Sequence, residues 1–220
     1  MTAIDYGRFN RVLTRSAELA GEPGMKQSVL RVYNDVLKES AHRFRTAHAA
    51  VSQAEAAFRK ENREALEALD LLDQPYRETR SVVLAFVPEA SLPATLKVQP
   101  TDTDKLNAIE SLLDRLDEHT GEPWAEEQSK GTFGQLAPRT VIELNEAIAA
   151  NKALADAREE RAAAYGPAYE RYLRFKRVVR DGLGAKSKQY KRIHVRGSSA
   201  EEGEDVPPGE GDNGGEPTKG

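Results

Sequence analysis

The sequence lacks several features that whole classes of proteins need. Among its 220 residues there is no cysteine, which excludes disulfide bonds, thiolate metal sites and cysteine nucleophiles. The longest purely apolar run is Val82–Val87, far shorter than the ~20 residues that span a bilayer. The first residues also lack the apolar stretch of a secretory signal. We therefore expect a cytoplasmic protein that does not associate with membranes.

Composition and length favour a single helical domain. Charged residues make up 31% of the chain and aromatic residues only 6%, which is typical of exposed helices rather than of a β-sandwich. A length of 220 residues fits one domain with a small appendage. Residues 197–220 hold seven acidic residues, one lysine and a single large aliphatic residue. They cannot bury enough apolar surface to fold, so we predict a folded domain over 1–196 and a disordered acidic tail.

Two long stretches have the pattern of long helices. No glycine or proline interrupts residues 26–74, and apolar residues recur at three- and four-residue spacing over 138–183. Their similar lengths predict an all-α fold with an elongated antiparallel two-helix stalk, similar to a coiled coil. Residues 75–135 would form a small helical head, and an amphipathic helix over 5–20 would pack on the stalk. An up-down-up bundle is the competing topology.

Prolines and glycines predict where regular helix stops. Pro75 lacks a backbone donor and should kink or end the first long helix, but apolar positions resume after it, so we expect helix on both sides of a break. The three prolines in residues 88–100 exclude a regular helix there. Residues 120–136 are expected to form a loop whose two large aromatic residues, Trp124 and Phe133, pack as local core rather than contact a ligand.

Polar residues interrupt the apolar seam of each long helix. Glu61 is the only polar residue among the first helix's seam positions 47, 51, 54, 58, 61, 65, 68 and 72. Asn151 and Arg158 interrupt the second seam, which runs through 141, 144, 148, 151, 155, 158 and 162. In an antiparallel stalk Glu61 would come near Asn151 or Arg158, where polar groups can set the helix register. The equal alternative is that local kinks turn these residues to solvent.

The search for catalytic and metal-binding residues favours a protein without either. Glu39 and His42 have the Glu-x-x-His spacing of di-iron bundles, but such a site needs a second copy of the element. No other histidine has an acidic residue three positions before it. The sequence also has no glycine-rich phosphate loop and no serine on a glycine-flanked turn. We therefore predict no metal, no cofactor, no small-molecule substrate and no enzymatic activity.

The strongest charge asymmetry lies in residues 171–196, which hold ten basic residues and one acid. The simpler explanation is that cations near a helix C-terminus offset the helix dipole while their stems cover apolar surface. The functional explanation is binding of a polyanion such as nucleic acid, with the acidic tail competing for the same cations. The residues that would bind the polyanion are Arg171, Arg174, Lys176, Arg177, Arg180, Lys186, Lys188, Lys191, Arg192 and Arg196.

A short pattern follows this basic helix, in the order Gly184-Ala-Lys-Ser187-Lys-Gln-Tyr190. Glycine allows a left-handed helix cap, and Ser187 can cap a following turn that returns Tyr190 to the bundle. The pattern resembles the C-terminal end of helical proteins of unknown function that diverse bacteria encode. The resemblance covers residues 169–193, and it implies no activity, cofactor or catalytic residue.

These observations predict a function in interaction rather than catalysis. A stalk with an exposed seam offers a surface to a partner helix or to a second copy of the chain. We expect a non-enzymatic helical scaffold or protein–protein interaction module whose partner is another protein or the chain itself. The alternative is polyanion binding through residues 171–196, modulated by the acidic tail.

Overall fold

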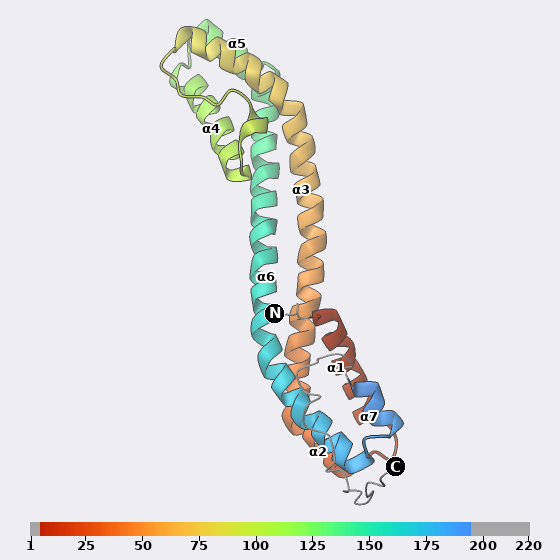
Figure 1. Ribbon diagram of the computed structural model, residues 1–220. Helices are drawn as coiled ribbons and strands as arrows, with labels where there is room; N and C mark the ends of the chain where they lie inside the picture. Colours follow the sequence, from red (N-terminus) through yellow and green to blue (C-terminus); the bar gives the residue numbers. More distant parts are fainter. Residues whose placement is uncertain (1–4, 195–220) are drawn as a thin grey trace, which may run out of the picture.

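The computed structural model describes residues 5–194, and the regular structure within that range is entirely helical. Two long helices lie side by side and antiparallel, and the shorter helices gather at the two ends of this stalk (Figure 1). The predicted all-α, elongated antiparallel bundle is thereby confirmed. The predicted disorder of residues 197–220 lies outside the described residues.

The first long helical path continues through its proline. It consists of α2 (Gln27–Val32), a π-helical turn at Tyr33–Leu37 and α3 (Lys38–Phe86). Helix lies on both sides of Pro75 as expected, but α3 runs through the proline to Phe86 without the expected break. A proline costs the helix one hydrogen bond, about 3 kcal/mol in a helix interior. Tyr76 and Val83, which are fully buried just beyond the proline, supply burial that offsets this cost.

The second long helix is α6 (Thr132–Leu183), whose 52 residues span about 78 Å. It begins earlier than the predicted residue 138, because residues 123–130 form the helix α5 (Pro123–Lys130) instead of part of a loop. The end of α5 passes very close to the first turn of α6. A Cβ atom on Gly134 would lie 1.8 Å from the Ser129 carbonyl oxygen, so this junction requires glycine.

One end of the stalk carries a compact head. Helix α4 (Asp102–Glu118) and α5 pack on the upper part of α3 and α6 (Figure 1). The segment before α4 contains a short 3-10 turn at Leu96–Val98, and Asp73 of α3 accepts a hydrogen bond from the Leu96 amide at 3.1 Å. Phe133 is buried in the head core and Trp124 is half-buried against it, as expected for local core residues.

The opposite end, which we call the base, is built around aromatic side chains. Helix α1 (Tyr6–Ala20) packs across the stalk, with Phe9 in edge-on contact with Phe44 of α3 at 5.0 Å between ring centroids. After Gly184, whose φ is +90°, Ser187 caps the short helix α7 (Lys188–Ile193) by accepting from the Tyr190 amide. The Tyr172 hydroxyl donates to the Ile193 carbonyl and ties α7 to α6.

The hydrophobic core is divided between the two ends. One cluster of buried residues lies in the head and another lies in the base. Val51 and Leu154 are buried in the stalk between them and belong to neither cluster. The fold therefore holds two separately packed ends apart by a thin pair of helices.

Candidate functional site

The two ends of the molecule carry opposite net charge. The base, residues 5–48 and 161–194, holds eighteen lysines and arginines and seven acidic residues, a net charge of +11. The head, residues 62–135, holds fifteen acidic residues and seven lysines and arginines, a net charge of −8. Folding creates this polarity, because it brings residues 5–48 and 161–194 together at one end of the stalk (Figure 1).

Three arginines form an exposed stripe on the base. Arg171, Arg174 and Arg177 recur every three residues on α6, while Tyr172 and Phe175 between them point into the base core. This alternation is what an amphipathic helix produces at the surface of a bundle. None of the three arginines forms an ion pair with another residue of the 5–194 range. Their charges are therefore available to a partner.

The other predicted polyanion-binding residues do not behave alike. Arg192 of α7 pairs with Glu18 at 3.3 Å and with Glu22, so it joins α7 to the region of α1. Arg180 lies 3.2 Å from Asp181. The other predicted cations in the described range also lie in the base. Lys176 on α6 is half-buried, whereas Lys186, Lys188 and Lys191 are exposed. Arg196 lies outside the described residues.

A matching acidic stripe lies on the head. Glu110, Asp114 and Asp117 are exposed on one face of α4, at the spacing of successive helical turns. No ion pair to these three carboxylates occurs within the described part of the chain. Asp102 and Glu118 of the same helix, by contrast, are paired with Lys105 and Arg115. Our sequence reasoning missed this stripe, although charge counted by segment would have indicated an acidic head.

The head also exposes an aromatic side chain at its tip. Phe86, the last residue of α3, is 59% exposed and stacks on Trp124, with ring centroids 4.8 Å apart. The Trp124 indole donates a hydrogen bond to Glu122, whose Oε1 also lies 2.9 Å from Nδ1 of His119. The stack adds an aromatic contact point to the acidic head, which also exposes Leu71 and Val98. Neither apolar periodicity nor a motif identified this stack.

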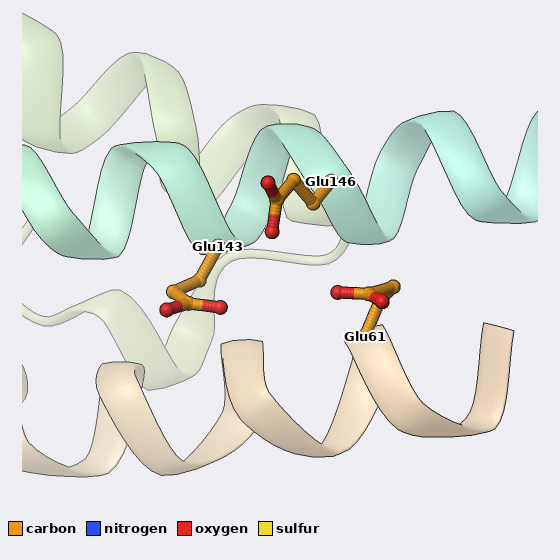
Figure 2. A group of neighbouring side chains, drawn as sticks. All are labelled: Glu61, Glu143 and Glu146. Carbon is orange, nitrogen blue, oxygen red and sulfur yellow. The ribbon is translucent and has the colours of Figure 1, made fainter. Parts of the chain in front are cut away.

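The predicted register partners of Glu61 are not the residues that it meets. Glu61 lies opposite Glu143 and Glu146, and the ligand atoms of the three carboxylates lie within 4.8 Å of one another (Figure 2). Asn151 is exposed, and Arg158 is also exposed and pairs with Glu55 at 3.1 Å. The reason is that α6 buries Ala147 and Leu154 in this region. Each lies one residue before a predicted seam position, 148 or 155, so the true seam is shifted by one residue.

Neighbouring cations offset part of the negative charge of the cluster formed by Glu61, Glu143 and Glu146. Glu61 pairs with Lys60 at 3.0 Å and Glu143 with Arg139 at 3.5 Å. Carboxylate oxygens suit hard divalent cations, but these ion pairs already offset part of the charge. Glu39 and His42, the earlier metal candidates, are exposed near the start of α3 and belong to no such group in residues 5–194. A register-setting role of Glu61 stays a prediction.

The junction of α1 with the stalk contains partly buried polar groups among aromatic rings. His48 of α3 stacks on Phe44, and Arg161 of α6 lies over the Tyr6 ring, 4.2 Å from its centroid. His48 Nδ1 and Arg161 Nε are shielded from solvent and have no hydrogen-bond partner within the described chain. Burial, and secondly the charge of Arg161, lower the pKa of His48 below its ordinary value of 6.5.

We expect this junction to weaken in acid. Because the His48 pKa is lower in the folded chain than in the unfolded chain, its stabilising effect is complete above pH 6.5 and is lost as pH falls toward the folded pKa. The melting temperature should therefore decline between about pH 7 and pH 5, and less steeply in His48→Gln. His42→Gln, an exposed histidine on the same helix, is the matched control. Equal pH profiles for His48→Gln and the unmodified chain would contradict this assignment.

Comparison with known proteins adds no family assignment, since no family model, curated protein or solved structure matches the chain. Among the helices of residues 5–194, none combines the length and the apolar character that crossing a membrane requires.

Proposed function

We propose that the chain is a non-enzymatic helical scaffold whose two ends bind partners of opposite charge. The observation that carries this proposal is the polarity of the rod, with +11 at the base and −8 at the head. Two separately packed cores support it, because each end has its own hydrophobic centre on which to present a surface. The intervening stalk of α3 and α6 would keep the two surfaces at a fixed separation (Figure 1).

The use of buried polar side chains also supports a structural role. Ser16, Ser40 and Thr140 donate to backbone carbonyl groups three or four residues earlier in the chain. Thr79 donates to Gln128 at 3.0 Å and joins α3 to α5. Catalytic sites ordinarily place polar side chains where they converge on a substrate, whereas these side chains serve the backbone or helix packing.

Polyanion binding at the base is the second candidate function. The exposed and unpaired stripe Arg171, Arg174 and Arg177 favours it, because guanidinium groups bind phosphate and sulfate oxygens in a bidentate manner. Nucleic acid is the biological polyanion that this chemistry fits most generally. The acidic residues 197–220 follow this end in the chain and would compete for the same cations.

Two charged probes test whether the ends bind independently. We expect the full chain at about 50 mM salt, diluted until it sediments as a monomer, to bind a fluorescent heparin oligosaccharide through the base and a short lysine-rich peptide through the head. Replacing Arg171, Arg174 and Arg177 by alanine should weaken heparin binding about tenfold or more and leave peptide binding unchanged. Glu110→Gln with Asp114→Asn and Asp117→Asn should do the reverse.

A matched control removes the same charge from elsewhere. Arg59, Lys152 and Arg158 are exposed cations of the stalk region, and their replacement by alanine should leave heparin binding nearly unchanged. The two-ended scaffold is contradicted if neither probe binds at low salt, or if each triple variant loses both probes. Loss of heparin binding that is equal in the base and stalk variants would contradict the second candidate function.

A further inference from the structure

We propose that a second copy of this chain is a partner of the first, and that the two rods pair antiparallel. In this pair the stripe Arg171, Arg174 and Arg177 of each copy faces the stripe Glu110, Asp114 and Asp117 of the other. The inference rests on the proposed scaffold function and names one of its partners. Both stripes are exposed, and both are free of ion pairs within the described residues.

The sign of the charge at each end selects the orientation. Parallel pairing would place the +11 base beside a second +11 base and the −8 head beside a second −8 head. Antiparallel pairing instead places each base beside a head, so that both ends of the pair are attractive. Like charges placed side by side weaken binding, and opposite charges speed the association of the two copies. Both effects favour the antiparallel pair over the parallel pair.

The two stripes also match in length. Six residues of α6 separate Arg171 from Arg177, a rise of about 9 Å, and seven residues of α4 separate Glu110 from Asp117, about 10.5 Å. Each stripe holds three side chains, and arginine forms bidentate pairs with carboxylates. A two-fold axis across the stalk repeats the contact, so that one pair contains two base-to-head contacts and closes on itself.

Charge-reversal variants of the full chain test this pairing. We expect sedimentation at about 50 mM salt to give twice the chain mass of 24.3 kDa, and about 0.5 M salt to give the monomer. The base variant carries Arg171→Glu, Arg174→Glu and Arg177→Glu, and the head variant carries Glu110→Lys, Asp114→Lys and Asp117→Lys. Each variant alone should be monomeric at low salt, with association at least about tenfold weaker than in the unmodified chain.

Mixing the two variants distinguishes pairing from loss of folding. The glutamates of the base variant face the lysines of the head variant at one contact, and the unmodified stripes meet at the other, so an equal mixture should regain the dimer. Reversal of the stalk cations Arg59, Lys152 and Arg158 to glutamate should leave the dimer intact. Helix content by circular dichroism should be the same in every variant.

The proposal is overturned if the unmodified chain is monomeric at low salt, if either variant alone still forms the dimer, or if the mixture stays monomeric. A mass that keeps rising with concentration would overturn the closed antiparallel pair, because head-to-tail chains grow without limit. These outcomes leave the scaffold function separately testable, since heparin and the lysine-rich peptide report on each end without a second copy. Neutralising the acids of residues 197–220 should strengthen the dimer if the tail competes for the base.

Discussion

Phe44→Ala is expected to lower the free energy of unfolding of the base by about 3–5 kcal/mol, the usual cost of deleting a fully buried aromatic ring. Phe44 is 0% exposed and contacts Phe9 of α1 and Tyr165 of α6, so one ring holds three helices together. The substitution should loosen the docking of α1 before it affects the head. Urea denaturation followed by circular dichroism measures the cost.

Hydrogen exchange locates the effect of this substitution. Amides of α1 should exchange much faster in Phe44→Ala, while those of α4 keep their protection, because the two cores are separate. Phe58→Ala is the matched control, since Phe58 is only half-buried on the stalk between the cores, and it should cost clearly less. Equal costs at the two positions, or equal loss of protection in α1 and α4, would contradict the division into two cores.

Asp73→Ala is expected to destabilise the head by about 2–3 kcal/mol, because it leaves buried donors without an acceptor. Asp73 is 4% exposed, and its Oδ1 accepts from the Thr95 hydroxyl and the Leu96 amide. Its Oδ2 lies 3.4 Å from Arg77 Nε. One carboxylate thus fastens the irregular segment before α4 to α3. Thermal denaturation of the head, followed by the fluorescence of Trp124, measures the loss.

Two variants control for the charge and for the position. Asp73→Asn keeps an acceptor oxygen and should retain more stability than Asp73→Ala. Asp70→Ala removes an exposed carboxylate that pairs with Lys97 at 3.3 Å, and it should change stability by no more than about 0.5 kcal/mol. If Asp73→Ala costs no more than Asp70→Ala, the buried carboxylate does not hold the segment in place.

The sequence was sufficient to predict the long helices but not their ends. The long stretch without glycine or proline before Pro75, and the three- and four-residue apolar spacing, indicated two stalk helices of similar length. Pro75 did not end α3, and Pro138 and Pro167 lie inside α6. A proline's local cost is known from the sequence, whereas the tertiary burial that offsets it becomes known only with the fold.

The seam of α6 illustrates a second limit. Counting one apolar stripe along the helix placed Asn151 and Arg158 inward, but α6 packs against α3 along the stalk, against α4 in the head and against α7 in the base. A helix with neighbours on different sides buries more than one stripe of residues. A single three- and four-residue spacing rule therefore assigns the wrong residues to the core where the buried stripe changes. Glu61 consequently meets Glu143 and Glu146 rather than its predicted partners.

The candidate surfaces were predicted in part. The basic segment 171–196 was evident from composition, and the fold exposes three of its arginines as one stripe. Arg192 was included on charge alone, and its ion pairs with Glu18 and Glu22 required the contact between α7 and α1. The polarity of the rod also required topology, because residues 5–48 and 161–194 are distant in the chain and meet only in the fold.

The distance between two spin labels tests most directly whether the stalk holds the two ends apart. The chain has no cysteine, so Thr46→Cys in the base and Ser81→Cys beyond Pro75 accept labels at these sites alone. Both positions are exposed on α3, and 35 residues of continuous helix separate them by about 52 Å. At about 0.5 M salt, where the proposed dimer dissociates, we predict a single narrow distribution near that distance. A broad distribution, or a maximum below about 35 Å, would show that the rod folds back on itself and would contradict the two-ended scaffold.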